Sequence, residues 1–174
     1  MTNTHTAKLQ QRYKELLPRT RDLSLLVLKG HLCIEEQIDA LLEASCDHPR
    51  DLQDARLTFH QKMCITRALG AWPKHGPFWP FVKGLTRLRN KLAHRLEQPS
   101  LKQDVDAVLK TFWGEEYKEP TSDQNRATVL RNTIGFMGGF LAGSAIGRKE
   151  RLAAMEASWR LSIGRVPTPT TAVS

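Results

Sequence analysis

The residues best suited to chemistry lie in one short segment, residues 88–95, with the sequence Leu-Arg-Asn-Lys-Leu-Ala-His-Arg. An unperturbed imidazole has a pKa of about 6.5, so a histidine such as His94 can act as an acid or a base near neutral pH. Arg89 carries a permanent planar guanidinium that fits phosphate oxygens, and Asn90 can orient the imidazole or donate to phosphate. RNA brings its own nucleophile, the 2′-hydroxyl. These residue types therefore fit metal-independent RNA cleavage, in which the 2′-hydroxyl attacks the adjacent phosphate.

Hydrophobic spacing places this segment in a predicted helix from about Phe81 to Glu97. At about 100° per residue, one face carries an apolar stripe formed by Val82, Leu85, Leu88, Leu92 and Leu96. The opposite face carries Lys83, Arg87, Asn90 and His94. Asn90 and His94 are four residues apart, so their side chains can touch.

Arg89 and His94 are five residues apart and diverge by roughly 140° around such a helix. A single chain is therefore a poor active site unless the helix bends. Two copies of the helix that meet across a two-fold axis would bring the histidine of one chain to the arginine of the other. We therefore expect a homodimer with a composite site.

Positive charge is concentrated on the same helix. Between Lys83 and Arg95 there are five basic residues and no acidic ones, and the whole chain has a formal net charge of +8. Such an excess favours a polyanionic partner. We expect four of these residues to follow the RNA backbone, namely Lys83, Arg87, Lys91 and Arg95. A solvated face that improves solubility is the alternative interpretation of the same charges.

The run from Arg89 to His94, Arg-Asn-Lys-Leu-Ala-His, resembles the signature of the HEPN superfamily, in which a polar residue follows an arginine and a histidine comes four to six residues later. Two upstream segments, 30–39 and 57–62, also resemble bacterial HEPN-type helices, in particular those of small proteins related to the mannitol operon repressor. The resemblance implies a HEPN-like helical fold and a metal-independent endoribonuclease of the kind found among toxins and phage-defence effectors. It also implies a dimer with a composite cleft.

Two classes of function remain open. In the first, an endoribonuclease, His94 acts as acid or base, Arg89 stabilises phosphate charge and Asn90 orients. In the second, a non-catalytic regulatory or scaffold protein uses the basic helix face to bind a partner; the resemblance allows this class too, since relatives of the mannitol operon repressor are regarded as regulators rather than nucleases. An antitoxin or a regulatory protein fits either class as a further partner. Leu96 stands where HEPN toxins paired with nucleotidyltransferase antitoxins carry tyrosine, which counts against that particular pairing.

Composition indicates an ordinary globular chain of 174 residues, 40% hydrophobic and 25% charged. The three cysteines, Cys33, Cys46 and Cys64, show no Cys-x-x-Cys spacing, which fits a reducing cytoplasm and no disulfide framework. We find no ligand-like spacing for a metal, no phosphate-binding loop and no Gly-x-Ser-x-Gly nucleophile elbow. The protein is therefore expected to be cytoplasmic, without metal or cofactor.

Periodicity predicts an all-α fold, an antiparallel bundle of four to five main helices. We expect a flexible N-terminus at 1–7, one helical domain at 8–163 and a disordered tail at 164–174. Expected helices include 8–17, one from Thr20 as N-cap to about Ala44, and 51–69 ended by Gly70. A loop should cover 71–80, Ser100 should open the next helix with a capping box, and further helices should start at Asp123 and at Lys149.

Two other features carry alternatives. The loop residues Trp72, Phe78 and Trp79 can either stack on bases or fill the edge of the core. The glycines at 135, 139, 143 and 147 form a smooth stripe that lets another helix approach closely. The uncharged run 132–147 is shorter than the roughly 20 residues that a membrane span needs. We therefore expect a buried helix or a subunit contact and no membrane span.

Overall fold

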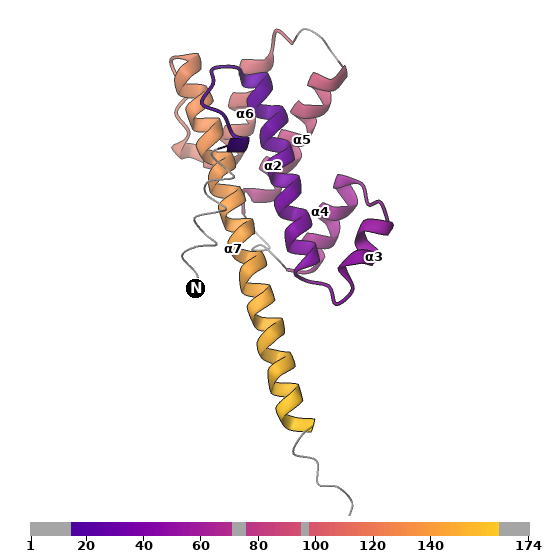
Figure 1. Ribbon diagram of the computed structural model, residues 1–174. Coiled ribbons are helices and arrows are strands. Elements are labelled where there is room, and N and C mark those ends of the chain that lie inside the picture. Colours follow the sequence, from indigo (N-terminus) through magenta and orange to yellow (C-terminus); the bar gives the residue numbers. More distant parts are fainter. Residues whose placement is uncertain (1–14, 71–75, 95–97, 164–174) are drawn as a thin grey trace, which may run out of the picture.

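The computed structural model describes residues 15–70, 76–94 and 98–163, and over these the chain is helical with no strand, as predicted (Figure 1). In chain order the elements are α2 (Leu23–Glu43), α3 (Pro49–Asp54), α4 (Phe59–Ala68), α5 (Phe78–His94), α6 (Leu101–Trp113), the short 3-10 helix η1 (Gly114–Glu116) and α7 (Asp123–Ile163). The predicted N-terminal region 1–7, most of the helix 8–17 and the tail 164–174 lie outside the described residues.

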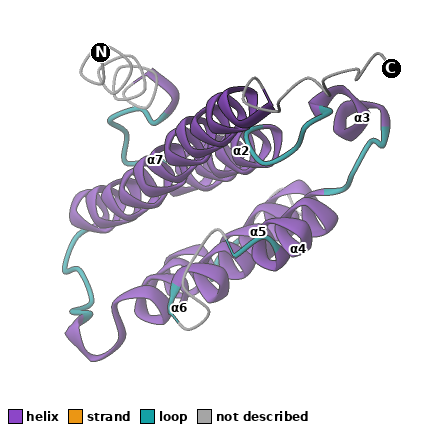
Figure 2. Cartoon of the chain, turned by 90° about the horizontal axis from the view of Figure 1, so that it is seen from below, coloured by secondary structure: helices purple, strands orange, loops and turns teal. Residues whose placement is uncertain are grey.

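Helix α2 is the centre of the fold, because it packs against α4 and α5 on one side and against α7 on the other. Figure 2 shows α2 and α7 side by side, with α4, α5 and α6 in a second layer. Apolar residues at helical spacing form a stripe on α2 that is buried along its whole length, at Leu23, Leu26, Val27, Gly30, Ile34, Leu41 and Leu42. Gly30 lets α7 approach closely, since a Cβ atom there would collide with the side chain of Ile134. Burial of this stripe drives the packing of both layers.

The direction of the helices agrees only in part with an antiparallel bundle. Helices α5 and α6 are antiparallel, since Lys91 pairs with Asp104 while Gly84 contacts Val108. Helix α7 instead runs parallel to α6, as three successive contacts show, from Lys102 to Asp123, Asp106 to Arg126 and Trp113 to Thr133. The segment from Gly114 to Ser122 therefore returns along α6 before α7 begins.

A buried ion pair holds this returning segment in place. Arg126 donates from Nε to both carboxylate oxygens of Asp106 at 2.9 Å, and from Nη2 to the carbonyl of Pro120 at 3.1 Å. The hydroxyl of Tyr117 donates to the same carboxylate at 2.5 Å. Burial raises the pKa of Tyr117, and the neighbouring carboxylate of Asp106 raises it further. The phenol therefore remains a donor, and the network fixes the start of α7 against α6.

Several predicted helix boundaries are wrong, and each error has a local cause. The helix predicted at 51–69 is two helices, because Thr58 and Gln61 form a capping box that starts α4 and Arg56 before it takes a positive φ of 47°. Asp22, not Thr20, is the N-cap of α2, accepting from the backbone N–H of Leu25 at 3.0 Å. The Thr20 hydroxyl accepts from the backbone N–H of Asp22 instead.

Helix α5 begins three residues earlier than predicted, at Phe78 rather than Phe81. Pro80 is tolerated because it lies in the first turn, where a backbone N–H has no partner within the helix. Phe78 and Trp79 are 0% and 6% exposed, so they fill the core rather than offer a stacking surface. Trp72 and the predicted C-terminal end of this helix, 95–97, lie outside the described residues.

Two further predictions concern α6 and α7. Ser100 stands at the N-cap of α6, yet its hydroxyl donates to the carboxylate of Asp104 and makes no cap hydrogen bond, so the capping box is absent. The helices expected to start at Asp123 and Lys149 are one continuous helix of 41 residues. Arg148 donates to the carbonyl of Leu69 at the end of α4, and the helix beyond it extends away from the bundle (Figure 1).

Among the described residues, none packs closely on the glycine stripe of α7. A Cβ atom added at Gly135, Gly139, Gly143 or Gly147 would meet nothing within 4 Å. The described residues therefore do not supply the close helix contact that the stripe predicts within one chain, and a subunit contact stays a prediction. Across the described ranges, every helix is too short or too polar to cross a bilayer.

Candidate functional site

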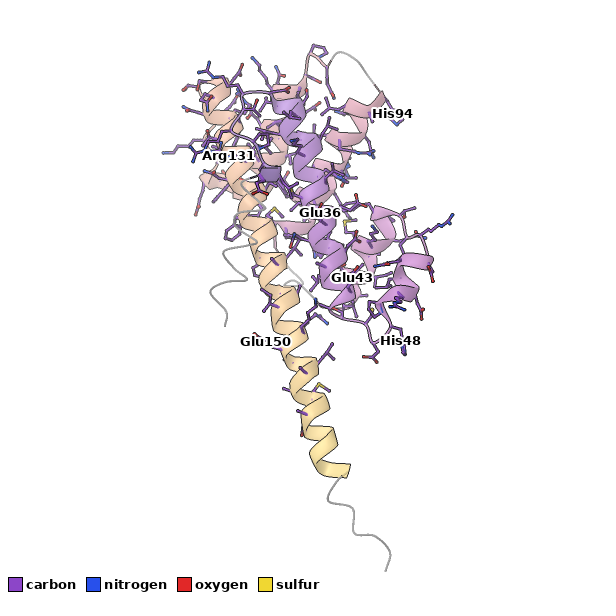
Figure 3. The ribbon with its side chains drawn as sticks, in the orientation of Figure 1. Glu36, Glu43, His48, His94, Arg131 and Glu150 are labelled. Atoms are coloured by element: carbon purple, nitrogen blue, oxygen red, sulfur yellow. The ribbon has the colours of Figure 1, made fainter. Side chains whose placement is uncertain are left out.

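The three predicted catalytic residues are exposed on the last two turns of α5. Arg89 donates from Nη1 to Oδ1 of Asn90 at 3.2 Å. In the described part of the chain no hydrogen bond joins Asn90 to His94, although they are one turn apart. Figure 3 shows His94 at the end of α5, pointing away from the bundle. Asn90 is therefore paired with the arginine and not with the histidine.

The charge of Arg89 acts on His31 of α2, although Arg89 itself is exposed. His31 is buried, at 5% exposed, and the centre of its ring lies 4.5 Å from that of Phe59. Burial lowers the pKa of His31; Glu35 opposes this effect, and the positive charge of Arg89 adds to it. Arg89 and His94 lie five residues apart in the single helix α5, so their side chains leave the helix about 140° apart around its axis.

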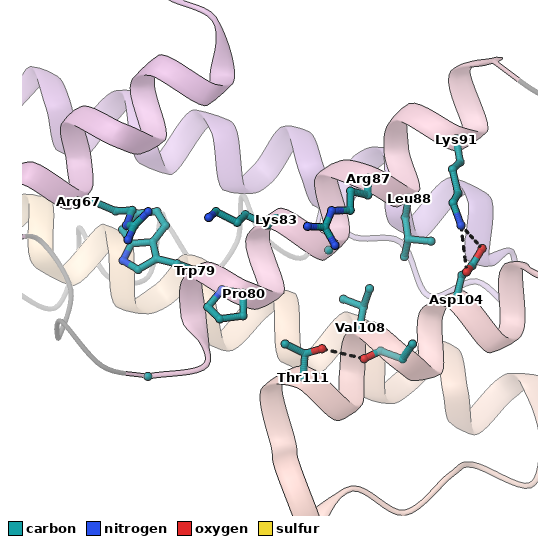
Figure 4. Close-up of a pocket in the computed structure, with 13 residues that line it drawn as sticks. Arg67, Trp79, Pro80, Lys83, Arg87, Leu88, Lys91, Asp104, Val108 and Thr111 are labelled. Atoms are coloured by element: carbon teal, nitrogen blue, oxygen red, sulfur yellow. Dashed lines mark hydrogen bonds and ion pairs between the residues drawn. The ribbon is translucent and has the colours of Figure 1, made fainter.

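Three basic residues of α5 line a cavity of about 700 Å³ between α5 and α6, which we call the α5–α6 groove (Figure 4). Its cations are Lys83, Arg87 and Lys91, together with Arg67 of α4. Three of the four predicted RNA-binding residues are thus brought together, while Arg95 lies outside the described residues. Arg67 was not predicted, because no spacing in the sequence links α4 to α5.

The groove cations follow one ridge of α5. Lys83, Arg87 and Lys91 are four residues apart, so successive side chains are offset by about 6 Å along the axis. At the Lys83 end, the guanidinium carbon of Arg67 lies 6.0 Å from the ring centre of Trp79, within reach of a cation–π contact. An anionic chain lying along α5 would therefore meet a positive charge at each helical turn.

Asp104 is the only acidic residue among the described residues that line the groove. Lys91 donates to its two carboxylate oxygens at 3.1 and 3.0 Å, and Ser100 donates at 3.1 Å. Burial alone would raise the pKa of Asp104, but the hydrogen bonds from Lys91 and Ser100 outweigh it and hold the pKa below its usual value. The carboxylate thus stays ionised and offsets one of the four cations.

His94 does not line the groove, but it lies close to one end of it. It follows Lys91 by three residues, and residues at this spacing are neighbours on a helix surface. A strand that leaves the groove past Lys91 would therefore reach the imidazole. Over the described residues, no group of three or more histidine, cysteine or carboxylate side chains is arranged to hold a metal ion.

Comparison with models of known families, with curated proteins and with solved structures finds no significant match to this chain. The resemblance to the HEPN superfamily therefore rests on the residues of α5 and the upstream segments alone. Its fold and its site define the protein as an all-α protein with a basic groove.

Proposed function

We propose that the protein is a metal-independent endoribonuclease of HEPN type that binds RNA along the α5–α6 groove and cleaves it beside His94. The observation that carries this proposal is the row of Lys83, Arg87 and Lys91 in one groove, with an exposed histidine one turn further along the same helix. Cations bind the phosphates, and histidine is the side chain that most often serves as general acid or base in catalysis.

In the proposed reaction the 2′-oxygen attacks the adjacent phosphorus, and the bond from phosphorus to the 5′-oxygen breaks. One imidazole removes the proton of the 2′-hydroxyl or supplies a proton to the departing 5′-oxygen. The products are a 2′,3′-cyclic phosphate and a 5′-hydroxyl. A guanidinium beside the phosphate stabilises the charge that develops on its oxygens.

The site is completed by a second copy of the chain. Arg89 bonds to Asn90 and leaves α5 about 140° around the axis from His94, so the two side chains of one chain point apart. In a two-fold dimer, His94 of one chain would meet Arg89 of the other, and Asn90 would orient that guanidinium. This differs from the role first expected for Asn90, which was to hold His94 or contact phosphate.

Complementation between inactive variants tests the composite site. His94→Ala and Arg89→Ala are each expected to abolish cleavage of RNA in EDTA, and Arg50→Ala on α3 is the control. Co-expression of the two variants should restore activity, since mixed dimers contain one site with both groups intact. Two inactive variants that stay inactive when mixed, although the mixed dimer is isolated, would exclude a site shared between chains.

A non-catalytic regulatory or scaffold protein is the second candidate. The observation that favours it is that neither Arg89, Asn90 nor His94 lines the groove. In that case wild type would bind RNA or an acidic protein through the groove, and the wild type and His94→Ala would leave RNA equally intact.

A further inference from the structure

The two walls of the α5–α6 groove differ in charge. The α5 wall carries Lys83, Arg87 and Lys91, whereas the α6 wall presents the small or apolar side chains of Ala107 and Val108 and the neutral Thr111. The Thr111 hydroxyl donates to the carbonyl of Ala107 at 2.9 Å, so its proton is already used. The only charge contributed by α6 is the carboxylate of Asp104. One wall therefore attracts anions and the other does not.

A single nucleic-acid strand has the same asymmetry, with phosphates along one edge and flat, largely apolar bases along the other. A duplex has phosphates on both outer edges and keeps its bases paired inside. A duplex in this groove would place its second row of phosphates against a neutral wall and against Asp104. The charge distribution therefore favours one strand over two.

The size of the groove leads to the same conclusion. Helices α5 and α6 meet closely at its floor, where a Cβ atom on Gly84 would lie 2.8 Å from Cγ2 of Val108. The volume of about 700 Å³ is that of a small-ligand pocket. The three cations of α5 span about 12 Å, which is a length suited to about three successive phosphates of one strand.

We infer that the α5–α6 groove binds a short stretch of single-stranded RNA, with phosphates on α5 and bases against Ala107 and Val108 of α6, and that it excludes duplexes. This inference rests on the proposed function for RNA as the ligand, but it does not require cleavage. Single-stranded DNA shares the phosphates and bases, and a preference for RNA over DNA would come from contacts with the 2′-hydroxyl.

Binding to three labelled oligonucleotides tests the inference, with fluorescence anisotropy as the readout and His94→Ala as the protein so that no ligand is cut. The probes are a 12-nucleotide RNA without secondary structure, the DNA of the same sequence and the RNA duplex. The single-stranded RNA should bind about tenfold or more tightly than the duplex. Ala107→Trp, combined with His94→Ala, fills the α6 wall on which the bases would lie and leaves the charge of the groove unchanged. It should weaken binding of the single-stranded RNA about tenfold, while the salt dependence of binding stays the same.

Lys83→Ala and Arg87→Ala test the phosphate side, since each should lower the slope of log affinity against log salt by about 0.7. Arg50→Ala on the exposed α3 should leave that slope unchanged. Ala107 is exposed, so its replacement should fold, and Ala107→Glu provides a second variant at the same position.

Equal or tighter binding of the duplex, no binding of single-stranded RNA, or normal single-strand binding by folded Ala107→Trp and Ala107→Glu would each overturn the inference. These results are distinct from failure of the proposed function. A wild type that prefers single strands but never cleaves them supports the groove and excludes the nuclease. A wild type that cleaves duplex RNA in a His94-dependent manner retains the nuclease and overturns the groove assignment.

Discussion

Lys91 donates to both carboxylate oxygens of Asp104, at 3.1 and 3.0 Å, and so joins the two walls of the groove at the end nearest His94. A ligand phosphate at Lys91 must compete with this carboxylate. We therefore predict that Asp104→Asn tightens RNA binding by about threefold to tenfold, because it removes one negative charge and frees one cation. The slope of log affinity against log salt should steepen by about 0.7, which is measured by titration at several salt concentrations.

Asp54→Asn is the matched control, since Asp54 is an exposed acid on α3 and α3 packs only against α2 among the major helix contacts. Both variants change the net charge equally. Equal effects of the two would show that only the overall charge matters, and that Asp104 does not compete for Lys91.

The Asp106–Arg126 pair should be essential to stability. The two side chains are 11% and 9% exposed. Without Asp106, the buried guanidinium of Arg126 keeps only the carbonyl of Pro120 and the more exposed carboxylates of Asp123 and Glu119, so its buried charge is poorly compensated. We predict that Asp106→Ala lowers the free energy of unfolding by about 3–5 kcal/mol, and that Tyr117→Phe lowers it by about 1.5–3 kcal/mol. Urea unfolding followed by circular dichroism measures both.

Lys102→Ala is the control for this pair, because it removes an exposed ion pair with Asp123 on the same two helices. It should change the free energy of unfolding little, since exposed ion pairs contribute little. A small effect of Asp106→Ala, comparable to that of Lys102→Ala, would mean that the returning segment is held by its apolar contacts instead.

The all-α class of the fold and the buried faces of its helices could be predicted, because both follow from the local periodicity of apolar residues. The stripe of α2 and the start of the stripe of α5, at Val82, Leu85 and Leu88, are buried as the spacing indicates. The break between α3 and α4 was also visible in principle, since Thr58 and Gln61 are spaced as a capping box. Residues 51–69 contain neither proline nor glycine, the residues that most often end a helix, so the segment resembles one continuous helix.

Contacts between distant segments could not be predicted in this way. The parallel course of α7 depends on Arg126 and Asp106, which are twenty residues apart, and on a loop that returns along α6. The groove depends equally on tertiary packing, because Arg67 comes from α4 and Asp104 from α6. The sequence indicated which face of α5 is basic, but not which helix forms the opposite wall or that an acid lies there.

Burial of His31 should make the protein sensitive to mild acid. Its pKa is lowered in the folded state, so below about pH 6.5 the unfolded chain binds more protons than the folded one. The contribution of neutral His31 to the free energy of unfolding is therefore complete above about pH 6.5. It is lost as the pH falls towards the lower pKa of the folded state. We predict that the free energy of unfolding decreases between pH 7 and pH 5, with this residue contributing at most about 1.4 kcal/mol per pH unit.

Other groups also titrate in this range, so the contribution of His31 is obtained by comparison. His31→Gln should show a shallower dependence of unfolding free energy on pH than wild type. Glu35, Lys62 and Asp39 form ion pairs around the same site, and Glu35→Gln should steepen the dependence. Parallel curves for wild type and His31→Gln would contradict the prediction.

Two glycines at helical positions should respond in opposite ways to replacement by alanine. A Cβ atom at Gly84 would lie 2.8 Å from Val108, a stiff β-branched residue, so Gly84→Ala should separate α5 from α6 and destabilise the protein. A Cβ atom at Gly139 meets nothing within 4 Å, so Gly139→Ala should gain helix propensity and stabilise a free helix by about 1 kcal/mol. Thermal unfolding measures both. If Gly139→Ala is instead less stable than wild type, and the difference grows with protein concentration, a second chain packs on the glycine stripe of α7 in the wild type.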